Sequence, residues 1–266
     1  MLTVNKEGLI AGFKRIGLNP GSTVLVHSAL SQFGRVDGGA DTVIDAIIET
    51  VGESGTVLVP TLTGDETLSP ENPPTFDLAN TPGWTGIIPE TLRKRPQAVR
   101  SLHPTHSAAA IGANAAMLTQ DHHQSITPCD LFSPYGKLAQ EEQGFILLLG
   151  VDHDANTTLH HVEEVVGVTY HLQKGLANCT LIVDGEQTKR HYYLHQYGTP
   201  RNFNVINQLL TERRIQRRVK IGKAEVRLIH AQSMVRLVAQ CLRADAEFLC
   251  EKNAIEAGFD LKQDGK

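Results

Sequence analysis

The stretch LGVDHDANTTLHHVEE, residues 149–164, brings three histidines and four acids together directly after an apolar run. On a helix, His160 shares a face with Glu163 and Glu164, because residues three and four positions apart are neighbours there. A carboxylate beside an imidazole fixes the tautomer of the ring and raises its basicity, as a general base requires. The spacing therefore indicates acid–base chemistry at His160, with an ordinary surface ion pair as the alternative.

The start of this helix and the cysteines bear on other kinds of chemistry. Asp154 is a good N-cap residue, so the helix is predicted to begin there. HHVEE does not have the HExxH spacing of a zinc hydrolase, and no third ligand follows from position. No CxxC pair occurs, which indicates neither a disulfide framework nor a cysteine zinc site. The cysteines are widely spaced, at Cys129, Cys179, Cys241 and Cys250. We expect no metal cofactor.

Two other motifs carry candidate ligand-binding groups. GRVDGGAD places Gly38 and Gly39 at the start of a helix, where free backbone N–H groups and the helix dipole suit a phosphate. A plain turn is the alternative for this motif. RSLHPTHSAAAIG gathers four polar residues around a proline, namely Arg100, His103, His106 and Ser107. Here the alternative is a proline turn before a strand of small residues.

Alternating strands and helices must position these residues. Strands are predicted at 23–30, 55–64, 107–111 and 145–150, with a hairpin over 179–194 that turns at Asp184-Gly185. Helices are predicted near 3–16, 40–51, 86–94, 113–120, 203–213 and 231–243. This alternation predicts an α/β layered sheet in one domain, residues 1–266. Three strands end in polar sequence, and if they are parallel neighbours these ends form one rim, where ligands bind. The rim would hold His27, Ser28, Thr61, Asp152, His153 and Asp154.

Charge is unevenly distributed along the chain, although the net charge is only −4. Residues 36–173 carry 18 acidic against 5 basic side chains, whereas residues 174–266 carry 10 against 16. The acidic part favours a cationic small-molecule ligand, with solvated helix faces as the alternative. The stretch 64–83, rich in proline, glycine and acids, is predicted to be a functional loop.

The sequence also restricts partners and location. The basic run RRIQRRVK, residues 213–220, lacks interleaved aromatics in a chain that is not basic overall, so we expect no nucleic-acid partner. The apolar runs are too short to cross a bilayer, and the N-terminal segment lacks the apolar core of a signal peptide. We therefore expect no membrane association and a cytoplasmic location. A monomer and a homodimer both remain open.

Five ordered motifs resemble those of the aminoglycoside 3-N-acetyltransferase family. They are LVHSALSQFGRVDGGADTVIDAI, GTVLVPTLTG, RSLHPTHSAAAIG, SPYGKL and LLLGVDHDANTTLHHVEE, and the resemblance runs from about residue 5 to residue 245. It implies a three-layer αβα sandwich with a mixed, largely parallel central sheet. It also implies transfer of the acetyl group of acetyl-coenzyme A to the 3-amino group of a 2-deoxystreptamine ring. In this family the transfer inactivates an antibiotic and needs neither a metal nor an acyl-enzyme.

The resemblance implies roles for individual residues. His160 matches the catalytic histidine, Glu163 the acidic position beside it, and Asp154 the acid that opens the helix. His27 is a second candidate for the reaction centre. The implied cofactor-binding residues are Ser28, Ala29, Leu30, Val36, Gly38, Gly39, Ala40, Arg100 and Ser107. The acids expected to hold the cationic substrate are Asp65, Glu66, Asp77, Asp152 and Glu163.

One departure from the family pattern leaves the substrate open. The stretch HYYLHQYGTPRNF lacks the acidic cluster that many members carry there, and His191, His195 and Arg201 stand in its place. The first alternative is therefore an acetyltransferase of the same fold that acts on another small amine. The others are a metal-dependent hydrolase built on the twelve histidines and a non-catalytic protein that sequesters a cationic molecule.

Overall fold

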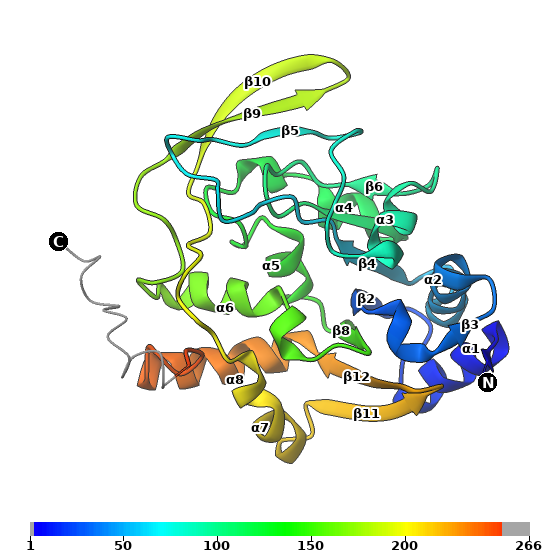
Figure 1. Cartoon of the computed structure of the whole chain (residues 1–266). Coiled ribbons are helices and arrows are strands. Elements are labelled where there is room, and N and C mark those ends of the chain that lie inside the picture. Colours follow the sequence, from blue (N-terminus) through cyan, green and yellow to red (C-terminus); the bar gives the residue numbers. More distant parts are fainter. Residues whose placement is uncertain (1–2, 252–266) are drawn as a thin grey trace.

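The computed structural model describes residues 3–251, and seven strands form its main sheet (Figure 1). From edge to edge these are β11 (Gln216–Ile221), β12 (Ala224–His230), β8 (Gly144–Leu149), β2 (Thr23–Ser28), β4 (Thr56–Pro60), β7 (Ala108–Gly112) and β6 (Val99–Arg100). β2 runs parallel to both β8 and β4, so the three strands with polar ends are parallel neighbours. The four outer pairs are antiparallel. The sheet is mixed, as predicted, but less parallel than predicted.

The hairpin β11–β12, which was not predicted from the sequence, accounts for part of this difference in strand direction. Its turn includes Gly222 at φ +59°, where a Cβ atom would come within 2.7 Å of Phe33 O. β11 contains most of the basic run at 213–220 and is an edge strand. Charged side chains on an edge strand discourage pairing with another chain, and Arg218 pairs with Glu225 at 3.8 Å. Most of the basic run therefore belongs to an edge strand of the main sheet.

Helices cover both faces of the sheet. Alternate strand residues face opposite sides, so Val24 and Val26 lie in one core and Leu25 in the other. The first face carries α1 (Lys6–Ile16), α2 (Gly39–Val51) and α3 (Ile87–Arg93). The second carries α4 (Ala115–Thr119), α5 (Pro134–Leu138), α6 (Thr158–Val166), α7 (Ile206–Glu212) and α8 (Ala231–Ala244). The α/β class and the three-layer sandwich are confirmed.

A three-stranded sheet outside the main one contains the predicted hairpin (Figure 1). β9 (Ala177–Val183) and β10 (Glu186–Tyr192) pair antiparallel, and the turn residues Asp184 and Gly185 both have positive φ. β5 (Thr75–Asp77) lies parallel to β9, with Phe76 in the separate core of this sheet. Part of the stretch 64–83 is therefore a strand, where the sequence predicted only a loop.

The chain enters its first helix later than predicted. Thr3–Val4 forms strand β1 beside β3 (Arg35–Val36), and α1 begins at Lys6. Asn5 caps this helix, because its side chain accepts a hydrogen bond of 3.0 Å from Gly8 N.

Four 3-10 turns connect the larger elements. They are η1 (Leu30–Phe33), η2 (His122–Gln124), η3 (His153–Ala155) and η4 (Phe203–Val205). Within residues 3–251, no helix is both long and apolar enough to cross a membrane.

Candidate active site

The carboxyl ends of the three parallel strands border a cavity of about 200 Å³. His27 and Ser28 of β2, Pro60 of β4 and Asp154 after β8 contribute to its wall. His160, from the first turns of α6, lines the same cavity. The predicted gathering of polar strand ends is confirmed for His27, Ser28 and Asp154.

Three other residues predicted at this rim face elsewhere. Thr61 Oγ1 lies 2.8 Å from Ser107 Oγ, and both side chains are buried. His153 is fully buried, and its Nε2 lies 2.7 Å from the side-chain amide of Gln216. Asp152 is exposed and accepts a hydrogen bond of 3.1 Å from the backbone N–H two residues on. None of the three lines the cavity.

His160 is held by the partner that its helical spacing predicts. Its Nδ1 lies 2.7 Å from Glu163 Oε2, and its side chain is 17% exposed. Burial lowers the pKa of His160, although the hydrogen bond with Glu163 opposes this effect. The ring is thus neutral near pH 7, with Nε2 left for a ligand or a proton. Of the three acids near it in sequence, Glu163 is the one that contacts the imidazole.

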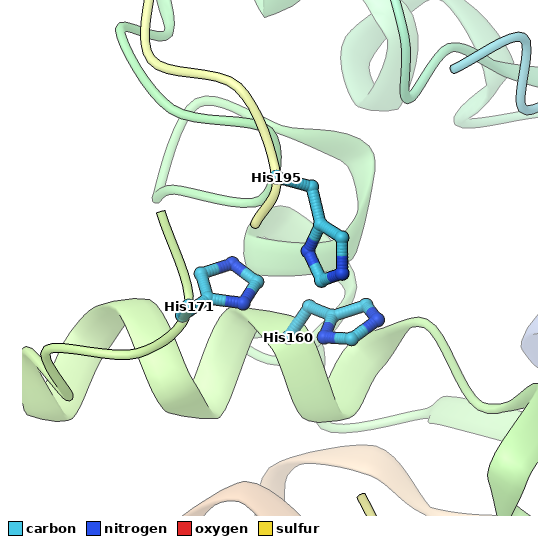
Figure 2. A group of neighbouring side chains, drawn as sticks. All are labelled: His160, His171 and His195. Carbon is cyan, nitrogen blue, oxygen red and sulfur yellow. The ribbon is translucent and has the colours of Figure 1, made fainter. Parts of the chain in front are cut away.

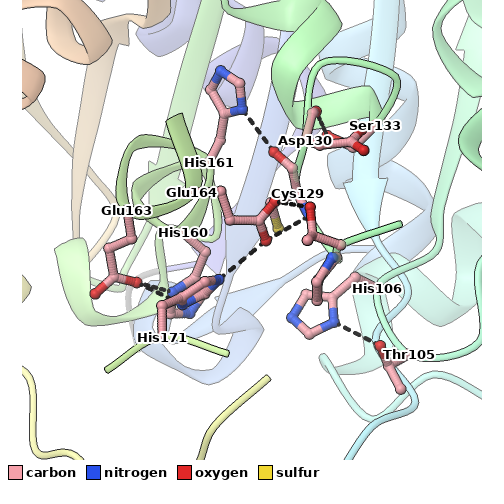
Figure 3. A network of polar contacts seen from close by, with 12 residues as sticks. Thr105, His106, Cys129, Asp130, Ser133, His160, His161, Glu163, Glu164 and His171 are labelled. Carbon is pink, nitrogen blue, oxygen red and sulfur yellow. Dashed lines mark hydrogen bonds and ion pairs between the residues drawn. The ribbon is translucent and has the colours of Figure 1, made fainter. Parts of the chain in front are cut away.

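Glu163 is fully buried and contacts three basic groups. Figure 3 shows two of them, His160 and His171. Its Oε1 accepts a hydrogen bond of 3.0 Å from Arg201 Nε, and its Oε2 lies 3.0 Å from His171 Nδ1 as well as against His160. Burial opposes ionisation, but the two histidines hold the pKa of Glu163 well below its usual range. Glu163 is therefore ionised and orients His160.

Glu164 points away from His160 and fixes His171 (Figure 3). Its carboxylate lies 3.0 Å from His171 Nε2 and accepts hydrogen bonds from Thr127 Oγ1 at 2.6 Å and Cys129 N at 2.9 Å. Burial lowers the pKa of His171, but Glu163 and Glu164 outweigh it, and the net shift is upward. Two adjacent acids of α6 thus bracket one imidazole.

Asp154 does not open α6, contrary to the prediction. It lies in η3, and its carboxylate accepts hydrogen bonds from Phe203 N at 3.0 Å and Asn204 Nδ2 at 2.7 Å. The helix begins at Thr158, whose N–H donates to Asn156 Oδ1 at 3.2 Å. The Asp154 carboxylate, which the local sequence predicted as the helix cap, therefore binds groups 49 and 50 positions away along the chain. Burial raises the pKa of Asp154.

His27 and Ser28 present unused polar atoms at the cavity. Among residues 3–251, neither His27 Nε2 nor Ser28 Oγ has a hydrogen-bond partner, and both atoms are buried. Burial, with a contribution from His153, lowers the pKa of His27 to about 3, so the ring is neutral. A neutral imidazole and a hydroxyl are both able to donate to a developing oxyanion.

The glycine pair expected to bind phosphate lies at the start of α2. Gly38 and Gly39 have φ of +75° and +64°, a conformation that favours glycine. No side chain caps this end of the helix, so its first N–H groups are open to a ligand. Ala40 is buried behind them, and Ala29, Leu30 and Val36 are half-buried nearby in sequence. An anion site here stays a prediction.

Arg100 and Ser107 have their polar groups engaged within the protein. Arg100 Nη1 donates to Thr81 O at 2.6 Å, Nη2 donates to Thr61 O, and the guanidinium lies 4.6 Å from the Phe76 ring centroid. Ser107 is fully buried and donates to Thr61 O at 2.9 Å. These contacts tie β5 to the main sheet. Contact of Arg100 and Ser107 with the cofactor stays a prediction. Their hydrogen bonds within the protein do not support it.

The acids expected to bind substrate lie in different places. Asp65 accepts hydrogen bonds from Thr67 N and Oγ1, and it borders a small cavity with His195 and Tyr197. Glu66 is exposed beside Asp65. Asp77 instead caps the turn after β5 by accepting from Ala79 N and Asn80 N, both at 3.0 Å. Asp65 and Glu66 remain candidates for substrate contact.

Two residues of the site were missed by sequence reasoning. His171 lies 5.0 Å from His160 between ring centroids, and no local pattern connects the two. Trp84 lines the main cavity with 61% of its surface exposed, and its Nε1 donates to Gly64 O at 2.9 Å. A single tryptophan in a proline- and glycine-rich stretch was the available signal for Trp84. No comparable signal pointed to His171.

The chain is similar to known proteins over most of its length. The sequence family described as aminoglycoside 3-N-acetyltransferase matches residues 25–243. Aminoglycoside N(3)-acetyltransferase IV of Salmonella sp is 32% identical over 235 residues, covering 86% of this chain and 84% of that protein. Aminoglycoside N(3)-acetyltransferase VII of Streptomyces paromomycinus is also 32% identical, with 87% and 89% covered.

Solved structures extend the similarity to three dimensions. Aminoglycoside acetyltransferase AAC(3)-Xa superposes with a TM-score of 0.80 at 31% identity, covering 93% of this chain and 94% of that one. A mutant of AAC(3)-IVa in complex with gentamicin gives 0.83 at 28% identity, with 99% and 97% covered. AAC-IIIb in a binary complex with CoASH gives 0.79 at 27% identity, with 91% and 97% covered.

Proposed function

The chain belongs to the aminoglycoside 3-N-acetyltransferase family, and we propose that it acetylates the 3-amino group of a 2-deoxystreptamine aminoglycoside directly from acetyl-coenzyme A. The observation that carries the proposal is the neutral His160, held by ionised Glu163 at the wall of the cavity. The CoASH-bound and gentamicin-bound relatives support the two ligand classes.

The proposed reaction uses His160 as general base. An aminoglycoside amine is largely protonated near neutral pH and must lose a proton before it attacks a thioester. His160 Nε2 accepts that proton, which is worth on the order of 10²- to 10⁴-fold in rate. The amine nitrogen bonds to the acetyl carbon, and the carbon–sulfur bond breaks. The departing coenzyme A thiolate takes up the second proton, which the nitrogen releases as it becomes an amide. Glu163 stabilises the imidazolium that forms.

Groups at the end of β2 support the electrostatic part of this mechanism. The unpartnered atoms, His27 Nε2 and Ser28 Oγ, line the same cavity as His160. In the proposal they donate hydrogen bonds to the thioester oxygen as it gains negative charge. Such preorganised donors are worth more in a buried site than in water.

The deciding experiment measures release of free coenzyme A with a thiol reagent. Acetyl-coenzyme A is mixed with gentamicin, apramycin or neomycin, and simple amines serve as controls. Release with an aminoglycoside, followed by location of the acetyl group on the 3-amine, is the expected result. Binding of acetyl-coenzyme A without release across the whole panel would contradict the proposal.

A second candidate is the same reaction on another small amine. The observation that favours it is the pair His195 and Arg201, in a stretch where many members of the family carry acids. Arg201 is already paired with Glu163, and His195 lies 4.6 Å from His160 between ring centroids. Release of coenzyme A with a simple amine, but with no aminoglycoside, would support this candidate. A cytoplasmic location also stays a prediction.

Gly39→Asp is expected to weaken coenzyme A binding about 3- to 10-fold, because a carboxylate at the first turn of α2 repels phosphate. The position has room, since no neighbouring atom lies within 4 Å of the point that a Cβ would occupy. Gly39→Asn is the matched control, because it has the same shape and the same tolerance of positive φ without the charge. Equal dissociation constants for the two variants by calorimetry would contradict the placement.

Replacing Asp65 and Glu66 with Asn and Gln is expected to raise KM for a polycationic aminoglycoside about 2- to 5-fold at low salt. The effect should shrink at high salt, because exposed charges are screened within about 10 Å at 0.1 M ionic strength. KM is measured at both salt concentrations. An equal change in KM at both would argue against electrostatic attraction of the substrate.

Ligand binding is expected to change the fluorescence of Trp84, the only tryptophan of the chain. The indole is half-open to solvent at the cavity and fixed by Gly64, so a ligand there alters its surroundings. Acetyl-coenzyme A and the aminoglycoside are titrated separately, with Trp84→Phe as the control without signal. A spectrum unchanged by either ligand, although calorimetry shows binding, would place both ligands away from Trp84.

A further inference from the structure

Three imidazoles from separate segments converge beside the cavity. Each of His160, His171 and His195 offers a ring nitrogen, and these nitrogens lie within 4.8 Å of one another. The ring centroids are 5.0 Å, 4.6 Å and 4.9 Å apart (Figure 2). His160 belongs to α6, His171 to the loop after it, and His195 to the segment after β10. The group is therefore made by tertiary structure and not by a local repeat.

One of these nitrogens is buried without a partner. Within residues 3–251, Nδ1 of His195 makes no hydrogen bond. Nδ1 of His171 makes no hydrogen bond either, but it lies 3.0 Å from Glu163 Oε2 in an ion pair. Buried polar atoms are nearly always satisfied in proteins, and a bound ion is one explanation for exceptions. The unpartnered nitrogen of His195, within a cluster of three imidazoles, points to a ligand-binding site.

Carboxylates hold the remaining nitrogens in the manner of a metal site. Glu164 bonds His171 Nε2 at 3.0 Å, and Glu163 lies 2.7 Å from His160 Nδ1. Histidines that bind metals commonly pair their other ring nitrogen with a carboxylate, which orients the ring and raises its basicity.

From these observations we infer that His160, His171 and His195 bind a divalent transition-metal ion, with zinc as the reference ion, and that the metal-bound protein is inactive as an acetyltransferase. Imidazole ligands suit zinc, copper and nickel better than magnesium or calcium. Tetrahedral zinc with Zn–N of about 2.0–2.1 Å separates its nitrogen ligands by about 3.3 Å. The rings must therefore close by up to about 1.5 Å.

The inhibitory part of this inference rests on the proposed function. If His160 is the base, a metal that it binds removes that base from the reaction. The binding part is independent of any activity, because a titration needs only the folded protein. The two parts therefore have separate measurements.

The test titrates zinc into metal-free protein by calorimetry, with Co²⁺ absorption as a second probe of coordination. One zinc per chain is expected, and His171→Gln and His195→Gln should each weaken its binding at least about 10-fold. His191→Gln is the matched control, because this histidine is exposed on β10 and should leave the affinity unchanged. Zinc should raise the melting temperature of the wild type and of His191→Gln more than that of the other two variants.

X-ray absorption at the zinc edge of the wild-type protein counts imidazole ligands without any variant. Three imidazoles would support the inference, and a site with fewer than three would overturn it. Loss of coenzyme A release in step with zinc occupancy, reversed by a chelator, would support the inhibitory part. Full activity with the site occupied would overturn that part. A protein that binds zinc at the three histidines but never transfers acetyl would contradict the proposed function alone.

Discussion

Replacing His160 with alanine should lower kcat for acetyl transfer by at least ~100-fold, by the usual contribution of a general base. The neutral ring lies at the cavity wall with Nδ1 engaged by Glu163, so Nε2 is the atom left to accept a proton. Alanine removes that acceptor. Affinity for acetyl-coenzyme A should change little, because the groups predicted to bind it lie on β2 and α2.

The neighbouring His161 supplies a control for this substitution. It faces the other side of α6, where its Nδ1 lies 2.6 Å from Cys129 O (Figure 3). His161→Gln should keep kcat within a few-fold of the wild type. Thiol release gives kcat and KM, and calorimetry gives the affinity for acetyl-coenzyme A. An unchanged kcat in His160→Ala would remove the proposed base, whereas lost affinity with unchanged kcat would make His160 a binding residue.

Replacing Glu163 with alanine should destabilise the protein by about 3–5 kcal/mol, the cost of breaking a buried ion pair from one side. The carboxylate is fully buried, and its removal leaves the guanidinium of Arg201 without its counter-charge and His171 with Glu164 as its remaining acidic partner. Urea unfolding measures the loss. Glu90, whose side chain is 16% exposed where that of Glu163 is fully buried, pairs with Arg93 and is the comparison. Glu90→Ala should cost less, because its carboxylate is the more exposed of the two.

The effect of Glu163 on kcat is tested with glutamine, which has the same shape as glutamate but no charge. Glu163→Gln should fold but lose at least about 10-fold in kcat, because an amide neither fixes the tautomer of His160 nor stabilises its protonated form. A double-mutant cycle with Arg201→Ala isolates the ion pair, since Arg201→Ala should cost less stability in the Glu163→Ala background. Normal stability and normal kcat in both Glu163 variants would contradict the arrangement.

The sequence by itself determined the features that depend on neighbouring residues. Alternating apolar residues such as Val24, Leu25 and Val26 specified a strand that is buried on both faces, and the strand ends located the cavity. The separation of His160 and Glu163 by three positions specified their contact, because the helix repeat brings such residues together whatever surrounds them. The hairpin turn at Asp184-Gly185 follows from local conformational preference in the same way.

Only the tertiary structure decided which distant groups complete the site. Arg201 and His195 reach His160 and Glu163 from the segment after β10, and nothing in their spacing specifies that approach. Asp154 bonds the backbone of Phe203 instead of capping α6, because packing offered it a long-range donor. The antiparallel outer strands likewise depend on pairing partners remote in sequence. Periodicity and turn preference act within a few residues, whereas the electrostatics of this site depend on where folding places the chain segments.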